Sequence, residues 1–151
     1  MLAKTLYEES YVNQIKDISY EDIYIGQKDT ITKTITAYDI NMFATITGDK
    51  NPVHLNETFA AKSIFKKRIA HGMLTGSLIS SVLGTKLPGA NTIYLNQSLK
   101  FLAPCYIGDT LTAVVEVIEK KDAKQILILN TVVTNQSNVK VVEGQAVIKK
   151  I

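Results

Sequence analysis

Two side chains that can transfer protons stand close together in TGDKNPVH, residues 47–54. Asp49 supplies a carboxylate and His54 is one of the chain's two histidines; such groups commonly act as general base and general acid. Gly48 and Pro52 favour an irregular, stiff loop, and loops of this kind often present reactive groups. Singly, each side chain has a structural explanation, as a turn acid or a hydrogen-bonding histidine. Together they form a candidate catalytic pair.

Two short helices are predicted to flank this loop. In YDINMFATI, residues 38–46, apolar residues recur every three positions, as on one face of an amphipathic helix. Thr36 is suited to cap its start, and Gly48 can end it in the left-handed conformation. A second helix is predicted over residues 57–62. The loop should therefore be held firmly at both ends.

A longer helix of a different character is predicted over HGMLTGSLISSVLG, residues 71–84. Apolar residues form one stripe, and glycine, serine and threonine occupy most of the remaining surface. Gly76 in a helix interior costs about 1 kcal/mol relative to alanine. We therefore expect another part of the fold to pack very close to this helix, as a sheet wrapped around it would. Gly84 and the Pro88-Gly89 pair are predicted to stop it.

The rest of the chain is predicted to be mostly strand. TITKTIT, residues 30–36, alternates in the period of two that is typical of a half-buried strand. ANTIYLNQSLKFL, residues 90–102, alternates similarly, which predicts one covered face carrying Ile93, Leu95, Leu99 and Phe101. Three further runs, separated by short polar turns, predict an antiparallel meander at residues 110–119, 125–134 and 140–149. The fold class is therefore α+β.

Composition restricts the class of protein. The 151 residues are 46% hydrophobic and 21% charged, as in an ordinary globular domain, and the net charge of +3 is too small to indicate nucleic-acid binding. The single cysteine, Cys105, excludes an intrachain disulfide and is expected to be a buried apolar residue. We expect a cytosolic protein with no membrane span. Residues 1–17 are expected to form an extension with a loose helical stripe at Leu2, Leu6, Tyr7, Val12 and Ile15.

The stretch from TGDKNPVH through AHGMLTGSLISSVLG resembles the signature of the MaoC-like (R)-specific enoyl-CoA hydratases. The resemblance continues through IYLNQSLKFLAPCYIGDTL and covers about residues 18–150. It implies one hotdog domain over residues 18–151, in which a long central helix, here 72–84, is wrapped by a curved antiparallel sheet. Asn56 departs from the aspartate that the family often has there, which puts the local loop hydrogen bonding in question.

The same resemblance implies roles for individual residues. Asp49 and His54 would hold a water molecule for addition to a trans-2-enoyl thioester. The Gly72 amide would receive the thioester oxygen, Ser80 would hydrogen-bond the catalytic acid, and Asn51 would order the loop. Water addition needs a base for attack on C3 and an acid that protonates C2. A helix-start amide is suited to the negative charge that develops on the thioester oxygen.

Several residues are candidates for contact with substrate. His71 is expected to orient the turn into the helix rather than take part in the chemistry. Lys67 and Arg68, with Lys62 and Lys66, are suited to the phosphates of coenzyme A, although a solvated charged face explains them equally well. Ile79 and Leu83 are expected to limit the depth of the acyl pocket.

The expected activity is that of an (R)-specific enoyl-CoA hydratase yielding (R)-3-hydroxyacyl-CoA, a product suited to polyester storage or another lipid route. Coenzyme A is part of the substrate, no separate cofactor is expected, and the two histidines match no zinc-site spacing. The resemblance implies a homodimer. A thioesterase is disfavoured because the central helix has no acidic residue. Two alternatives remain: a 3-hydroxyacyl-carrier-protein dehydratase and a non-catalytic acyl-CoA binding module.

Overall fold

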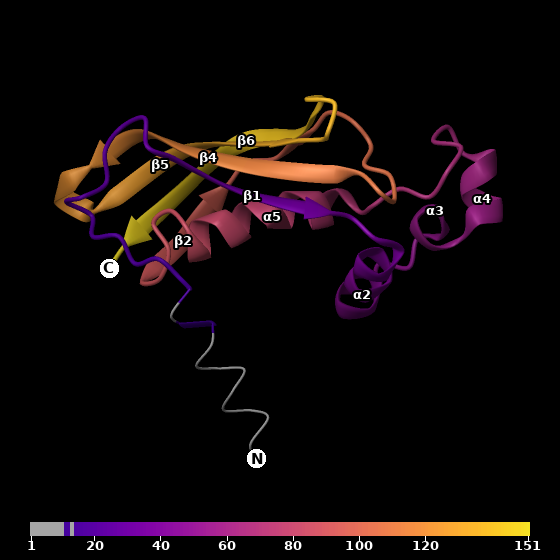
Figure 1. Ribbon diagram of the computed structural model, residues 1–151, viewed down its shortest axis with the longest axis horizontal. Coiled ribbons are helices and arrows are strands. Elements are labelled where there is room, and N and C mark those ends of the chain that lie inside the picture. The colour runs from indigo at the N-terminus through magenta and orange to yellow at the C-terminus, as the bar shows by residue number, and fades with distance from the viewer. Residues whose placement is uncertain (1–10, 13) are drawn as a thin grey trace, which may run out of the picture.

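A single antiparallel sheet arches over one long helix, with three short helices gathered beyond one end of the sheet (Figure 1). The protein is described from a computed structural model, which places residues 11, 12 and 14–151. The strands and helices follow in the order β1 Lys28–Thr34, α2 Ala37–Thr47, α3 Pro52–Leu55, α4 Glu57–Lys62, α5 Gly72–Thr85, β2 Thr92–Gln97, β3 Lys100–Phe101, β4 Thr110–Lys121, the 3-10 helix η1 Asp122–Lys124, β5 Ile126–Thr134 and β6 Lys140–Lys150.

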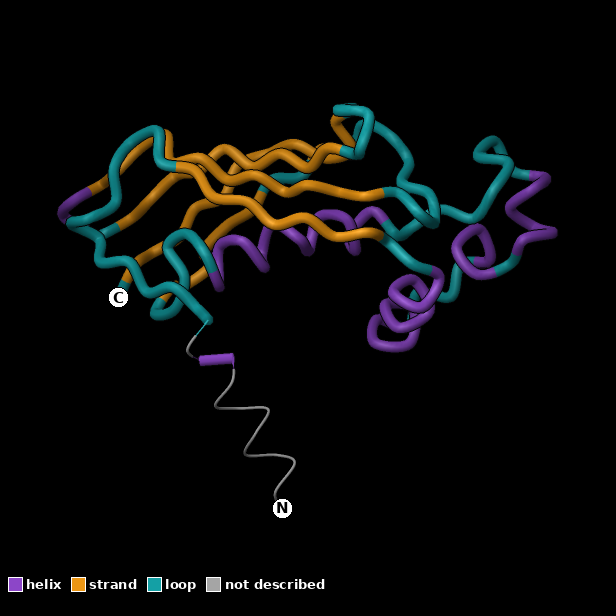
Figure 2. The backbone as a smooth tube through the Cα atoms, viewed as in Figure 1, coloured by secondary structure: helices purple, strands orange, loops and turns teal. Residues whose placement is uncertain are grey.

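The sheet has the strand order β1-β4-β5-β6-β2, and β3 also pairs with β6. Strands β4, β5 and β6 form the predicted meander, and their inward side chains alternate with outward ones. The sheet contributes the fully buried side chains of Leu111, Leu129 and Ile148 to the core. Helix α5 contributes those of Ile79 and Val82. The helix lies along the concave side of the sheet (Figure 2). This arrangement is the α+β hotdog architecture expected above.

Helix α5 is as long as predicted, with one correction at its end. Gly84 lies inside the helix, which continues to Thr85. The close approach inferred from Gly76 is confirmed, since a Cβ added there would lie 3.1 Å from a methyl group of Leu99. None of the described helices is both long enough and apolar enough to cross a membrane.

The prediction for residues 90–102 was wrong in two respects. The segment is broken into β2 and β3, and Ile93, Leu95 and Phe101 are exposed rather than covered. Period-two alternation separates the two faces of a strand, but it does not show whether anything covers either face. In this chain β2 is the last strand of the sheet order, so one of its edges is open as well.

The short helices are held by the predicted caps. Thr36 and Asp39 form a reciprocal capping box at the start of α2, and Gly48 ends that helix with φ of 78°. The loop prediction for residues 47–54 needs correction, because Pro52–Leu55 forms the helical turn α3, capped by Asn51. Proline is favoured at the first helical position because it has no N–H to leave unpaired.

The junction between the N-terminal extension and the body is tied by polar contacts. Lys150, which is buried, contacts Asp17 and donates to the carbonyl of Ala90 at 2.8 Å. Lys16 forms a 2.6 Å ion pair with Asp29. Residues 16 and 17 are therefore attached to the domain. Leu2, Leu6 and Tyr7 of the predicted stripe lie outside the described residues.

Gly144 allows the break between β2 and β3. A Cβ at this position of β6 would lie 1.8 Å from the carbonyl oxygen of Ser98. We expect Gly144→Ala to lower the free energy of unfolding by at least about 2 kcal/mol, because backbone must move to admit the methyl group. Urea denaturation would measure the loss. The control is Gly84→Ala, which meets no atom within 4 Å and should be neutral or gain up to about 1 kcal/mol. Equal stability of the two variants would contradict this explanation.

Candidate active site

Asp49 lies in the short connection between α2 and α3, with an exposed carboxylate. Its Oδ1 accepts a 3.2 Å hydrogen bond from the backbone N–H of Asn51, and its own N–H donates to Thr47 Oγ1 at 3.2 Å. Asn51 in turn caps α3 by accepting from the Val53 N–H at 3.2 Å. The predicted role of Asn51 in ordering the loop agrees with these contacts.

His54 is a buried residue of α3 whose ring orientation is set by a backbone carbonyl. Its Nδ1 lies 2.8 Å from the carbonyl oxygen of Ile69. A carbonyl can only accept, so Nδ1 carries the proton and Nε2 of the neutral ring keeps a free lone pair. Burial lowers the pKa of His54, the hydrogen bond to Ile69 opposes this, and His71 lowers it further. The neutral imidazole, the form able to accept a proton, is therefore favoured.

His71, just before α5, holds the loop that carries Asp49 next to the start of that helix. Its Nε2 lies 2.9 Å from the carbonyl oxygen of Asp49, so by the same reasoning Nε2 is the donor. The ring is buried, and its centroid is 3.9 Å from that of His54. Its Nδ1 is buried and has no partner among the described residues. The expectation that His71 is an orienting residue fits this geometry.

Gly72 begins α5 and lies on the wall of the same hollow. The first amides of a helix have no acceptor within the helix, and the Gly72 N–H makes no hydrogen bond in the part of the chain that the structure describes. A Cβ here would lie 2.9 Å from the Phe101 ring. Glycine therefore allows the Phe101 ring to pack against the start of α5. This hollow is the candidate catalytic pocket, called the catalytic pocket below; it measures about 340 Å³ and is lined by Phe43, Thr47, Asp49, His54, His71, Gly72, Met73 and Phe101.

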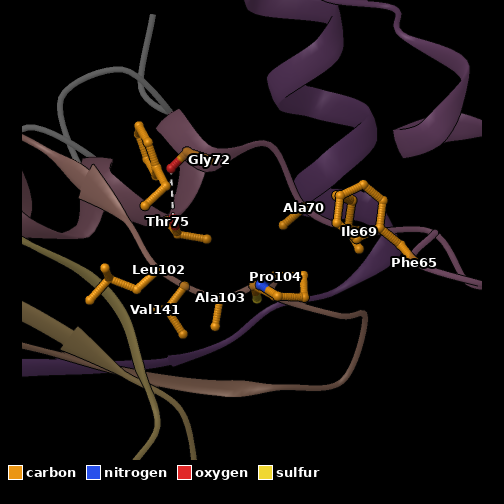
Figure 3. Close-up of a pocket in the computed structure, with 11 residues that line it drawn as sticks. Phe65, Ile69, Ala70, Gly72, Thr75, Leu102, Ala103, Pro104 and Val141 are labelled. Atoms are coloured by element: carbon orange, nitrogen blue, oxygen red, sulfur yellow. Dashed lines mark hydrogen bonds between the residues drawn. The ribbon is translucent and has the colours of Figure 1, made fainter. Parts of the chain in front are cut away.

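A second hollow adjoins this pocket. It measures about 310 Å³, and its walls come mainly from residues 65–75 and 101–105 (Figure 3). Gly72 and Phe101 line both spaces. Cys105 lies on its wall as a buried residue, as expected, and burial raises the pKa of its thiol to about 12. We call this space the apolar cavity.

Three predicted residues lie away from the pocket. Ser80 is exposed and is eight residues along α5 from Gly72, which corresponds to about 12 Å. Within one chain it does not hydrogen-bond Asp49. Ile79 and Leu83 point into the core and line neither hollow. Helical periodicity marked both as inward-facing, but it did not show that the sheet fills the space in front of them.

The residues of the basic cluster predicted over residues 62–68 differ in their contacts within the domain. Arg68 donates from Nε to the His54 carbonyl at 2.6 Å and from a terminal nitrogen to Asn41 Oδ1 at 3.1 Å. Arg68 therefore stabilises the packing of α3 against α2, and these guanidinium nitrogens are already used within the domain. Lys67 is exposed and makes no salt bridge among the described residues. Asn56 caps α4 by accepting from Phe59 N–H at 2.8 Å, so the departure from aspartate keeps this hydrogen bond.

Phe43 and Phe101 were missed as site residues by sequence reasoning. Phe43 was noted only as part of the apolar face of the helix predicted over residues 38–46, yet its ring lies 4.9 Å from that of His71 and also lines the catalytic pocket. Phe101 was assigned to a covered strand face. The close approach of its ring to Gly72 depends on how β3 passes α5, which no local pattern reports.

Asp49, His54 and His71 each offer one metal-ligand atom, and these atoms lie within 4.8 Å of one another. One nitrogen of each ring is bonded to a carbonyl, which leaves His54 Nε2 and His71 Nδ1 as the two remaining ring nitrogens, and the rings lie against each other. What the arrangement offers directly is proton transfer. A carboxylate and a neutral imidazole face one pocket beside an unpaired helix-start amide, which suits a reaction with an oxyanion intermediate.

The chain belongs to the MaoC-like domain family, whose model matches residues 24–140. It is 49% identical to an (R)-specific enoyl-CoA hydratase of Rhodospirillum rubrum over 129 residues, which cover 85% of this chain and 89% of the relative. It is 42% identical to the enzyme of the same name from Aeromonas caviae, over 87% of this chain and 98% of that one. The unliganded R-hydratase PhaJ1 of Pseudomonas aeruginosa superposes with a TM-score of 0.86 at 44% identity, over 91% and 89% of the two chains.

Proposed function

We propose that this protein is an (R)-specific enoyl-CoA hydratase, a hydro-lyase that adds water to trans-2-enoyl-CoA and yields (R)-3-hydroxyacyl-CoA. The observation that carries the proposal is the convergence of Asp49, His54 and the free Gly72 amide on one pocket. Similarity to two enzymes of this name over most of the chain supports the same activity. The composition and single cysteine are consistent with a cytosolic enzyme.

In the proposed reaction the water molecule lies between the Asp49 carboxylate and His54 Nε2. Asp49 accepts a proton from the water while the water oxygen bonds to C3. The electrons of the double bond move toward the thioester carbonyl. A proton is then delivered to C2 by the pair, so that one hydroxyl and one hydrogen are added and both side chains return to their starting state. His54 can share this transfer because its Nδ1–H stays bonded to the Ile69 carbonyl.

The Gly72 amide would stabilise the enolate that forms during attack. Its N–H meets the negative oxygen at the positive end of the α5 dipole. His71 holds the carbonyl of Asp49, while its own neighbour along the chain is Gly72. The start of α5 therefore positions both the proposed base, Asp49, and the proposed oxyanion donor, the Gly72 amide. Such fixed spacing is what a reaction at C3 and at the thioester oxygen of one substrate requires.

The direct test is to mix the purified protein with crotonyl-CoA and follow the ultraviolet absorbance of the enoyl thioester. A dehydrogenase specific for the (R)-3-hydroxy thioester would identify the product. Rapid loss of absorbance with (R) product supports the proposal. If crotonyl-CoA and longer enoyl-CoA substrates all remain unchanged while coenzyme A still binds, a non-catalytic binding module would replace it.

The pKa of His54 predicts how activity depends on pH. Burial holds this pKa below its usual value of 6.5, and the neutral ring is the active form. The acidic limb of kcat/KM should therefore fall below pH 6.5. Stability has the same sign: between the two pKa values the unfolded chain binds more protons, so the free energy of unfolding falls as pH drops below 6.5. If kcat/KM instead begins to fall with decreasing pH already above pH 7, and this fall is absent in His54→Ala, the assignment would be contradicted.

We also propose that the enzyme is a homodimer. Ile93, Leu95 and Phe101 on β2 and β3 are exposed, and β2 ends the sheet. Apolar side chains beside an open strand edge favour pairing with another copy. Ser80 could then act on Asp49 only from the second copy, because within one chain it lies too far along α5. Light scattering should report twice the mass of the chain.

Ser80→Ala is expected to reduce activity only moderately. If the Ser80 hydroxyl supports the carboxylate of Asp49 across the dimer, we expect kcat to fall about tenfold, the size of one lost hydrogen bond to a charged group. The dimer mass and the melting temperature should be unchanged. Ser77→Ala is the matched control, since Ser77 is also exposed on α5 and donates to its own helix, to the carbonyl of Leu74 at 2.7 Å. Full activity of Ser80→Ala would reduce Ser80 to a packing role.

A further inference from the structure

Both histidines of the chain meet beside the Asp49 carboxylate. The chain contains two histidines, His54 and His71, and the centroids of their rings are 3.9 Å apart. Together with Asp49 they offer three metal-ligand atoms that lie within 4.8 Å of one another. The hydratase reaction proposed above uses Asp49 and His54 for proton transfer, but it gives the second imidazole no chemical part.

In each ring the other nitrogen is tied to a backbone carbonyl. His54 Nδ1 donates to the carbonyl oxygen of Ile69 at 2.8 Å, and His71 Nε2 donates to that of Asp49 at 2.9 Å. Histidines that ligate metals almost always donate their second ring N–H in this way, which fixes the tautomer and the ring orientation. His54 Nε2 and His71 Nδ1 are therefore left with lone pairs, as two metal ligands require.

The lone pair of His71 Nδ1 is unsatisfied. The side chain is only 2% exposed, and its Nδ1 has no hydrogen-bond partner among the described residues. Buried polar atoms are nearly always paired, so an atom of this kind calls for a partner from outside the chain. His71 lines the catalytic pocket together with Asp49 and His54, and a cation held there would supply that partner.

The donor set selects the kind of cation. Two imidazoles and one carboxylate suit Zn²⁺, whereas Mg²⁺ and Ca²⁺ prefer sites made of oxygen ligands. Zinc holds nitrogen ligands at about 2.0–2.1 Å, so two ligands of one tetrahedral ion are about 3.4 Å apart. Atoms within 4.8 Å of one another reach this spacing through small side-chain movements. The exposed Asp49 carboxylate can move most easily, since within the described residues it accepts a single hydrogen bond, at 3.2 Å.

The rest of the chain offers zinc few ligands that could compete. There is no third histidine, and the single cysteine, Cys105, is buried. Burial raises the pKa of its thiol to about 12, which disfavours the thiolate that binds metals. In the part of the chain that the structure describes, Asp49, His54 and His71 are the one group of three suitable ligands. Tight zinc binding by this chain would therefore report on this group.

We propose that Asp49, His54 and His71 form an inhibitory zinc site, in which His54 Nε2, His71 Nδ1 and one Asp49 carboxylate oxygen hold a single Zn²⁺. The bound ion occupies the lone pairs that accept and return protons in the proposed reaction. Zinc and proton transfer by the pair therefore exclude each other. The inhibition rests on the proposed hydratase function, but the binding does not.

The first test measures zinc binding without any substrate. Competition with a chromophoric chelator gives the dissociation constant of the purified protein for Zn²⁺. We expect one ion per chain with a dissociation constant below about 10 μM, and Mg²⁺ in large excess should not displace it. Weaker binding of zinc, or displacement by Mg²⁺, would overturn the site.

His71→Gln tests the unsatisfied nitrogen by itself. The glutamine amide can still donate to the Asp49 carbonyl, but it has no imidazole lone pair. The zinc dissociation constant should rise by more than about 100-fold, because even the partners of metal ligands are worth about 10- to 100-fold in affinity. The melting temperature without zinc would verify that the variant folds. Undiminished zinc affinity in the folded variant would overturn the site.

Two control variants and a second ligand variant complete the binding test. Asp22→Asn changes an exposed aspartate outside the group, and Cys105→Ala removes the thiol; both should bind zinc as the wild type does. Loss of binding in Cys105→Ala would assign the ion to the thiol and overturn the proposal. His54→Asn should lose affinity as His71→Gln does, which keeps the site testable if His71→Gln does not fold.

The last test follows turnover of crotonyl-CoA at low substrate concentration. Free Zn²⁺ at ten times its dissociation constant should lower the initial rate about tenfold, and EDTA should restore it. Mg²⁺ at the same concentration should have no effect. An unchanged or faster rate with zinc bound would overturn the inhibition.

Failure of the hydratase function is distinguishable from failure of the zinc site. If the wild-type chain hydrates no thioester but binds zinc through both histidines, the function is wrong and the site stands. If it hydrates crotonyl-CoA but binds zinc no more tightly than His71→Gln does, the function stands and the site is wrong.

Discussion

Asp49→Asn should reduce kcat for crotonyl-CoA hydration by about 10²- to 10⁴-fold, the usual contribution of a general acid or base. The amide is close in shape to the carboxylate, and its oxygen can still accept the hydrogen bond from the Asn51 N–H. What it loses is the ability to take a proton from water. KM should change little, since in the proposed reaction Asp49 acts on the water and not on the coenzyme.

The fold should not change, because the Asp49 carboxylate is exposed and has few partners. Circular dichroism and the melting temperature would establish this. Asp22→Asn is a matched control, because Asp22 is an exposed aspartate remote in sequence from the site whose carboxylate accepts from Ser19 at 2.8 Å. An Asp49→Asn enzyme that is folded and retains wild-type turnover would remove Asp49 from the mechanism.

His54→Ala should also lower kcat by about 10²-fold or more. This change does two things at once: it removes the Nε2 lone pair and leaves the Ile69 carbonyl without its donor. An orphaned buried acceptor costs about 1–3 kcal/mol, so some loss of stability is expected as well. Rapid-mixing kinetics with crotonyl-CoA would measure the activity, and urea denaturation the stability.

His54→Asn separates the two effects. The asparagine amide can still donate to the Ile69 carbonyl, but it offers no basic nitrogen to the water. It should therefore be more stable than His54→Ala and equally inactive. If His54→Asn recovers activity together with stability, His54 serves only to support α3, and the proton transfer belongs to Asp49 alone.

Sequence reasoning succeeded where a periodic pattern was long. The helix at α5 and the strands β4, β5 and β6 follow apolar spacing that one face of the core imposes. Helix α3 was missed because four residues are too few to show a period, and Pro52 was read as a loop signal although it also suits a helix start.

For the site, local spacing identified Asp49 and His54 but not their supporting contacts. The hydrogen bond between His71 and the Asp49 carbonyl joins residues 22 positions apart. Arg68 was grouped with the lysines by charge, and only the packed structure shows that its guanidinium is enclosed by α2 and α3. Ser80 was carried over by resemblance, which says nothing about which copy of the chain a residue serves.

The three residues proposed to act directly on water and thioester, Asp49, His54 and Gly72, come from one continuous stretch, residues 49–72, beyond the end of the sheet (Figure 1). The buried strands β4, β5 and β6 contribute none of them. Selection can therefore alter chemistry and substrate preference in this stretch while the meander continues to supply most of the buried core. Mutational scanning should show two populations of sensitive positions, one revealed by activity alone and one by abundance, with Gly72 and its neighbours on α5 as the border between them.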